Sequence, residues 1–238
     1  ALSGRLKLKP VSRTSLILAL ALSLPPFSAA HAQSPEDFAL NATSELALAH
    51  VITSDKEVDA IALAGLRGLS DVLFQRTSIE PSPPVSLNLE RDELAFFPLL
   101  YWPISIAQPT PTPAAYARLN AYLRSGGMIL FDTRDANFAG YGTASPTGRI
   151  LQTLAASLDI PPLEPIPKDH VLTRTFYLLQ DFPGRHLGPD IWVEASRGDA
   201  EIVEGMPFRN PNDGVTPAVI GGNDWAGAWA VTETGTAL

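Results

Sequence analysis

The sequence contains no cysteine. This absence excludes disulfide bonds, thiolate nucleophiles and zinc sites with thiolate ligands. Basic residues are also scarce, because 17 Lys and Arg stand against 25 Asp and Glu, which gives a net charge of −8. Surfaces that bind DNA or RNA need clustered Lys and Arg to displace counterions from phosphates. We therefore expect neither thiol chemistry nor a nucleic-acid partner.

The basic residues that are present gather at the start of the chain. Residues 1–33 contain four of them and no acid: Arg5, Lys7, Lys9 and Arg13. Removing these four positive charges from the whole-chain −8 leaves −12 for residues 34–238. A domain this acidic is expected to stay off anionic lipid surfaces.

An apolar run over residues 15–24 follows these bases, and Ala30-His31-Ala32 comes shortly after it. That order matches a secretory signal cleaved after Ala32. If residues 25–27 are included, the run approaches the ~20 residues that cross a bilayer, so a retained membrane span also fits. A buried core helix explains the flanking bases poorly. In either membrane-targeting case the bases stay in the cytoplasm and residues 34–238 are outside.

After a linker at residues 34–45, strand and helix patterns alternate over residues 46–238, and an apolar content of 45% is sufficient for a core. The expected strands are 46–52, 77–80, 94–102, 128–131, 171–179, 191–195 and 218–221. The expected helices begin after Ser54, at Thr112, near Ile150 and at Trp225. The alternation predicts an α/β domain with a doubly wound, mostly parallel sheet.

Three local signals refine this prediction. Ser54 and Glu57 have the spacing of a capping box, with Ser54 as the N-cap of the first helix. Residues 94–102 are apolar without alternation, which indicates burial on both faces of a parallel sheet. Two proline-rich stretches are expected outside the sheet, residues 81–84 as a turn and residues 161–167 as a crossover loop.

Three stretches, residues 92–103, 126–135 and 182–185, carry a family resemblance. From about Leu46 to the last residue, the chain resembles the bacterial domain-of-unknown-function family 4159. The resemblance implies a flavodoxin-like fold similar to that of class I glutamine amidotransferases. It also implies a preceding membrane region, of which residues 16–27 would be the last span. The chain would then be a piece of a longer protein, and the final strand and helix of the family domain would lie beyond Leu238.

Glutamine amidotransferases attack with a cysteine on a strand-to-helix elbow, which a histidine activates. This sequence has no cysteine, and no Gly-x-Ser-x-Gly elbow replaces it. The glycines at residues 140–142 are too short a signal for a phosphate cradle. We therefore assign no catalytic residue, metal or cofactor, and a binding domain is favoured over an enzyme.

Ligands of open α/β sheets bind beyond the carboxyl ends of the strands. Polar and aromatic residues expected near such ends are the candidate ligand-binding residues: Tyr101, Trp102, Asp132, Arg134, Asp135, His170, Arg185, Asn223 and Asp224. Each has a purely structural alternative: the aromatic residues can pack in the core, the acids and Asn223 can cap turns or helices, and His170 can lie at a strand start.

Three hypotheses follow. The first is a non-catalytic domain that binds an unidentified ligand or envelope protein, located on the periplasmic side of the bacterial inner membrane and tethered by residues 1–33. The second is a hydrolase or transferase, metal-assisted or acid/base, that uses Asp132, Asp135 and His170. The third is a structural component of a membrane complex. Under the first hypothesis Asp132 serves the site and not the fold, so Asp132→Ala is expected to leave stability unchanged or raised.

Overall fold

The computed structural model describes residues 46–136, 145–174, 178–187, 191–195 and 216–238. The chain divides into two units, Ala1–Ser34 and Pro35–Leu238, and all of the described residues belong to the second. Among them, no helix combines the length and the apolar character that crossing a membrane requires. The predicted membrane-targeting segment, the linker and the glycines at residues 140–142 lie outside the described residues.

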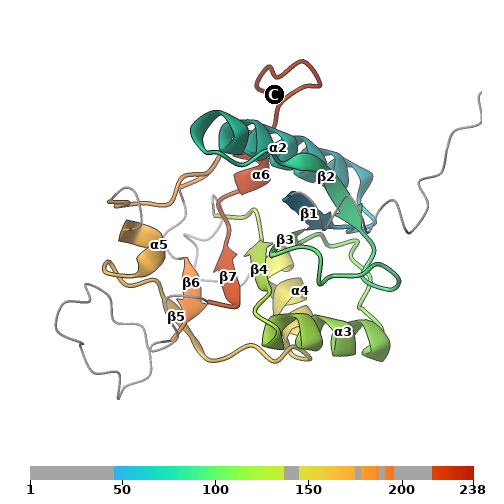
Figure 1. The fold of residues 1–238 in the computed structure, drawn as a ribbon. Coiled ribbons are helices and arrows are strands. Elements are labelled where there is room, and N and C mark those ends of the chain that lie inside the picture. The colour runs from blue at the N-terminus through green and yellow to red at the C-terminus, as the bar shows by residue number, and fades with distance from the viewer. Residues whose placement is uncertain (1–45, 137–144, 175–177, 188–190, 196–215) are drawn as a thin grey trace, which may run out of the picture. The chain divides into compact units, whose positions relative to one another are not determined.

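A mixed sheet forms the centre of the described domain (Figure 1). Its strands follow the order β2-β1-β3-β4-β7-β6-β5. Their bounds are β1 Ala47–Val51, β2 Ser82–Leu87, β3 Leu99–Pro103, β4 Met128–Asp132, β5 Leu163–Pro165, β6 Trp192–Glu194 and β7 Ala218–Gly221. The first five strands in this order pair in parallel, whereas β6 is antiparallel to β7 and β5 is antiparallel to β6.

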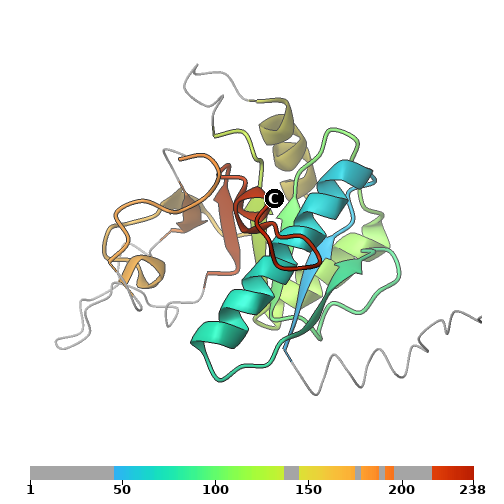
Figure 2. The ribbon, with the colours of Figure 1, turned by 90° about the horizontal axis from the view of Figure 1, so that it is seen from above.

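Helices cover both faces of the sheet (Figures 1 and 2). One face carries α2 (Lys56–Arg76) and α6 (Trp225–Trp229), and the other carries α3 (Pro113–Arg124) and α4 (Pro146–Ala155). Neighbouring residues of β3 point to opposite faces, so Tyr101 joins the core under α2 and α6 while Trp102 joins the core against α3 and α4. The doubly wound α/β fold is confirmed.

The first helix begins one residue later than the predicted capping box allows. Asp55, and not Ser54, is the N-cap of α2, and its carboxylate accepts hydrogen bonds from the backbone N–H groups of Glu57 and Val58 at 3.2 and 3.3 Å. Ser54 has a φ of 67°, which places it in the left-handed turn that precedes the cap. The capping-box prediction was therefore wrong, because a second capping residue stood next to the chosen one.

The proline-rich stretches were also interpreted wrongly. Residues 77–80 form no strand, and β2 instead begins at Ser82 and includes Pro83 and Pro84. The predicted crossover loop at residues 161–167 contains β5. Both strands lie at an edge of the sheet, where a proline does not remove a hydrogen bond to a second neighbour.

Two apolar stretches are only partly extended. Within residues 94–102 the strand starts at Leu99, and the preceding chain turns, with the Phe97 N–H donating to the Leu94 carbonyl at 3.1 Å. The strand predicted at residues 171–179 is wrong, because Val171–Arg174 forms the short helix α5 and residues 178–179 are not in a strand. Apolar content alone did not distinguish strand from buried helix or turn.

Candidate ligand-binding site

Polar residues gather where β1, β3, β4 and β7 end, at the carboxyl edge of the parallel sheet. The chain connects β1 to β2 on one side, whereas β3 lies on the other, so the direction of winding reverses between β1 and β3. Open α/β sheets bind ligands at such a switch point. Among the described residues, three non-glycine residues have positive φ, and each follows one of these strands: Ser54, Arg134 and Asp224. Strained backbone of this kind concentrates at functional sites.

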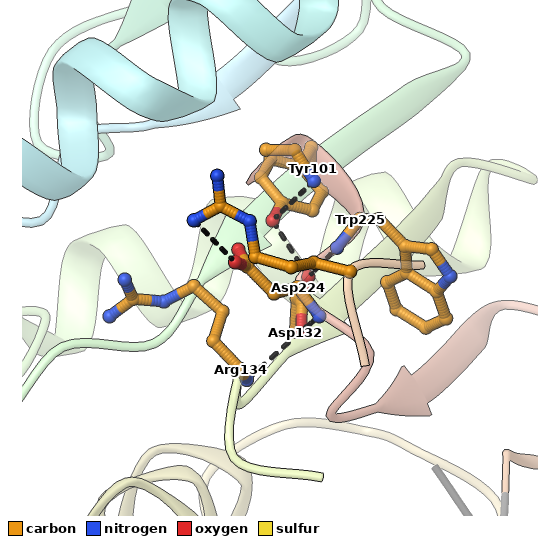
Figure 3. A network of polar contacts seen from close by, with 7 residues as sticks. Tyr101, Asp132, Arg134, Asp224 and Trp225 are labelled. Atoms are coloured by element: carbon orange, nitrogen blue, oxygen red, sulfur yellow. Dashed lines mark hydrogen bonds and ion pairs between the residues drawn. The ribbon is translucent and has the colours of Figure 1, made fainter. Parts of the chain in front are cut away.

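Asp132, the last residue of β4, lies at the centre of this edge (Figure 3). One carboxylate oxygen, Oδ2, accepts from the Tyr101 hydroxyl at 2.8 Å and from the Trp225 N–H at 2.7 Å. The other, Oδ1, accepts from the N–H groups of Arg134 at 3.0 Å and Asp224 at 3.2 Å. The fully buried carboxylate thus joins β3, β4 and the start of α6.

Burial is the main cause of the pKa shifts of Asp132 and Tyr101. It raises the pKa of Asp132 to about 6, although the hydrogen bonds from Trp225, Tyr101 and the other donors oppose the shift. Burial, together with the charge of Asp132, also raises the pKa of Tyr101 well above its usual value. At neutral pH the phenol is therefore the proton donor and the carboxylate is the acceptor.

Arg134 connects Asp132 with the switch point. Its backbone N–H binds Asp132, while its side chain extends away from that carboxylate (Figure 3). The Nη2 atom donates to the Ile104 carbonyl at 2.9 Å, just beyond the end of β3. The Nε atom is buried and has no hydrogen-bond partner within the described part of the chain. The guanidinium is therefore held in place and keeps unused donor capacity.

Asp55 lies beyond the end of β1 and faces β3. Its Oδ2 atom accepts from the Ser105 hydroxyl at 3.0 Å, which joins the two sides of the switch point. The N–H of Val58 and the Ser105 hydroxyl lower the pKa of Asp55, and the positive charge of Arg134 contributes to this shift. Asp55 is therefore a carboxylate at neutral pH.

A segment at residues 178–187 brings a second arginine to the end of β7. Asn223 is fully buried and anchors this segment. Its side-chain Nδ2 donates to the Phe182 carbonyl at 3.1 Å, and its backbone carbonyl accepts from the His186 N–H at 3.0 Å. A Cβ atom on Gly184 would lie 2.5 Å from the Cβ of Asn223, so only glycine permits this approach. Arg185 then lies 3.7 Å from the Oδ2 atom of Asp224.

These contacts define what we call the carboxyl-edge site: Asp55, Ser105, Arg134, Asp224 and Arg185. The site extends along neighbouring strands from β1 to β7, and its charges alternate in sign. Its arginines can bind acceptors and its carboxylates can bind donors. The one hydroxyl of the site, that of Ser105, donates to the Asp55 carboxylate, and no histidine hydrogen-bonds to any of these five residues among the contacts of the described chain.

Three predicted residues have contacts outside this site. Trp102 is buried on the opposite face, where its ring centroid lies 5.4 Å from that of Phe131. Asp135 accepts from the hydroxyls of Ser145 and Thr147, which ties the end of β4 to the start of α4. His170 is mostly buried, its Nδ1 accepts from the Leu172 N–H at 3.2 Å, and burial lowers its pKa.

The structure therefore does not bring Asp132, Asp135 and His170 together. In the residues that the structure describes, no hydrogen bond or ion pair joins any two of them. The described part of the chain also holds no group of three His, Asp or Glu side chains suited to a metal ion.

Asp55 and Ser105 were not among the residues predicted from the sequence. Both come shortly after a strand, so the rule that selected Asp132 also applied to them. Asp55 was passed over because it was taken as an interior position of the capping box. Ser105 was not named among the candidates, although it comes three residues after the expected strand end at Trp102.

Residues 47–237 match the family model described as a domain of unknown function, DUF4159. The chain belongs to this family. None of the curated proteins matches the chain. Two of the three stretches that carried the resemblance contain residues of the carboxyl-edge site of this DUF4159 domain, Arg134 and Arg185, and the third contains Tyr101, which donates to Asp132.

Proposed function

We propose that this DUF4159 domain is a non-catalytic domain that binds a small polar ligand at the carboxyl-edge site. The observation that carries the proposal is the unused capacity of Arg134, whose guanidinium is anchored at Ile104 yet keeps a buried donor without a partner among the described residues. Burying an unpaired donor costs roughly 1–3 kcal/mol, which a bound ligand can recover. Charged groups at a switch point are the pattern of a binding site.

The left-handed turns support binding over catalysis. In amidotransferase-like folds a turn after a strand presents the nucleophile, whereas here the turns after β4 and β7 carry Arg134 and Asp224. An arginine stays protonated and cannot attack. Ser54 has a hydroxyl, but no histidine among the described residues hydrogen-bonds to it.

The carboxylate at the end of β4 is likewise committed to the fold. Four donors surround Asp132, so it has little capacity left to coordinate a metal or to move a proton. With Asp135 and His170 bound elsewhere, no observation favours the hydrolase or transferase hypothesis. None favours a purely structural component of a membrane complex either.

The proposal includes a location. The order of bases, apolar run and linker in residues 1–45 supports placing the domain on the periplasmic side of the bacterial inner membrane. There the ligand would be a periplasmic small molecule or a group on an envelope protein.

A screen of small polar molecules against the whole chain tests the proposal. Binders would be selected by thermal unfolding in mild detergent and located by hydrogen–deuterium exchange. We expect slower exchange in the loops after β1, β3, β4 and β7, with the ligand recovered unchanged. Protection confined to other surfaces, or conversion of the ligand to a product, would contradict the proposal.

A further inference from the structure

We propose that the ligand carries an oxyanion group, a carboxylate or a phosphate, which Arg134 and Arg185 bind. This inference rests on the proposed binding function and adds the chemical class of the ligand. It follows from comparing the donors and acceptors that the fold leaves available at the carboxyl-edge site.

Two of the carboxylates at this edge, those of Asp132 and Asp55, are already occupied. Asp132 receives four hydrogen bonds. Asp55 receives the Ser105 hydroxyl on one oxygen and the N–H groups that start α2 on the other. A ligand that presents donors to either of these two carboxylates would therefore have to displace contacts that hold the fold together. The acceptors left are the Asp224 carboxylate, which faces Arg185, and the Oδ1 atom of Asn223, which is buried without a partner among the described residues.

The donors, in contrast, are only partly used. A guanidinium carries five N–H donors. Arg134 commits Nη2 to the Ile104 carbonyl, and its Nε has no partner among the described residues. Arg185 is separated from Asp224 by 3.7 Å and half of its side chain is exposed, so this ion pair is weak and the arginine can turn toward a ligand. A ligand that fits these donors carries several hydrogen-bond acceptors.

Arg134 is also pre-organised for an anion. Its backbone is fixed by the left-handed turn and by the N–H bond to Asp132, and its far end is fixed at Ile104. Little side-chain freedom remains to be lost on binding, which favours affinity. A planar guanidinium can then hold a carboxylate or phosphate through two parallel hydrogen bonds.

The test is calorimetric titration of the whole chain with two anions, sodium phosphate and sodium succinate, at constant ionic strength. Succinamide, which is neutral and similar in shape to succinate, is the third probe. The variants are Arg134→Gln and Arg118→Gln. Arg118 is the matched control, because it also donates to a backbone carbonyl and has a buried Nε without a partner in the described chain, but it lies on α3.

We expect one of the two anions to bind wild type and Arg118→Gln equally, and Arg134→Gln at least ~10-fold more weakly, which corresponds to one charge-assisted contact. Which anion binds distinguishes carboxylate from phosphate. Arg185→Gln, at an exposed position that the fold does not require, should also weaken binding, so the test survives if Arg134→Gln fails to fold.

Equal affinity for succinamide and succinate, or unchanged affinity in both arginine variants, would overturn the inference. Failure of both anions to bind would overturn it as well. If a neutral molecule from the screen then still protected the carboxyl edge, the proposed binding function would stand without the anion. If no molecule did so, both proposals would fall.

Discussion

At the scale of single residues, Asp132 contributes to the fold more than to the site. The sequence predicts the opposite, because the four donors that converge on this carboxylate come from distant parts of the chain as well as from the next turn. Asp132→Ala leaves three backbone N–H groups and a phenol buried without their acceptor. We expect the free energy of unfolding to fall by ~2–4 kcal/mol at pH 7. Urea unfolding measures this, with Asp71→Ala on the exposed side of α2 as a neutral control; equal stability would restore the original expectation.

The raised pKa of Asp132 predicts a pH dependence. Its folded pKa of about 6 lies above the ordinary 3.8, so between these values the folded state binds more protons than the unfolded state. Stability from this group is therefore present at low pH and is lost as pH rises through the folded pKa, by about 3 kcal/mol in total from roughly pH 3 to roughly pH 7.

Asp132→Asn does not ionise and lacks this contribution. The difference in unfolding free energy between wild type and Asp132→Asn, measured by urea unfolding at several pH values, should shift toward the variant as pH rises to about 7 and then become constant. A difference that is flat across this range, or that moves the other way, would show that burial does not control the ionisation of Asp132.

The positions of the candidate residues were predictable only as far as the rule that ligands bind beyond the carboxyl ends of parallel strands. The carboxyl-edge rule selected Asp132, Arg134 and Asp224 correctly as residues of one edge. It could not tell the two faces of β3 apart, so Trp102 was included with Tyr101 although their side chains point in opposite directions. Nor could it reveal which polar atoms are satisfied, since those partners come from distant parts of the chain.

At the scale of elements, α2 and α6 meet through glycines. A Cβ on Gly68 would lie 2.0 Å from the Trp229 carbonyl oxygen, and one on Gly65 would lie 2.5 Å from the Ala226 carbonyl oxygen. Replacing glycine with alanine normally stabilises a helix by ~0.5–1 kcal/mol. Gly68→Ala should instead destabilise by ~1–3 kcal/mol, because the obstructing atom is backbone and cannot rotate away.

Thermal unfolding tests this close packing, with Gln75→Ala on the exposed side of the same helix as control. We expect a lower melting temperature for Gly68→Ala and an unchanged one for Gln75→Ala. A stabilised Gly68→Ala would mean that α6 does not pack against α2 as described.

The start of α2 yields a second prediction at this scale. Since Asp55 is the N-cap, Asp55→Ala should lower the unfolding free energy by ~1 kcal/mol. The neighbouring Ser54→Ala should have little effect, because the exposed Ser54 side chain makes no hydrogen bond among the described residues. Denaturant unfolding of both variants decides between the two capping assignments, and a larger loss for Ser54→Ala would support the capping box.

Helices were predictable where residues that typically start or end a helix stood at the ends of a segment with helical spacing of its apolar residues. Thr112 with Pro113 marked the start of α3, and Gly126, whose φ is 95°, marked the turn after its end. The edge strands β2 and β5 were missed because they contain prolines, because β5 has only 3 residues, and because their extended form depends on neighbours in the sheet. Strand propensity is a property of the segment alone, whereas an edge strand also depends on hydrogen bonds to the neighbouring strand of the sheet.

At the scale of the whole molecule, the charge pattern of residues 1–33 predicts the side of the membrane on which the domain lies. A reporter enzyme that is active only outside the cytoplasm, fused after Gln33, should be active because four bases precede the apolar run. A reporter that works only in the cytoplasm serves as the control and should be inactive at the same position. Activity of the cytoplasmic reporter would place residues 34–238 inside the cell and refute the location.

The central claim is that the carboxyl edge of this DUF4159 domain binds a ligand without transforming it. The most direct measurement is a crystal structure of the protein with the tightest ligand from the thermal-unfolding screen. We expect density for the intact ligand at the ends of β1, β3, β4 and β7, in contact with the guanidinium of Arg134. Density for a reaction product, or for a ligand bound away from Arg134 and this edge, would contradict it.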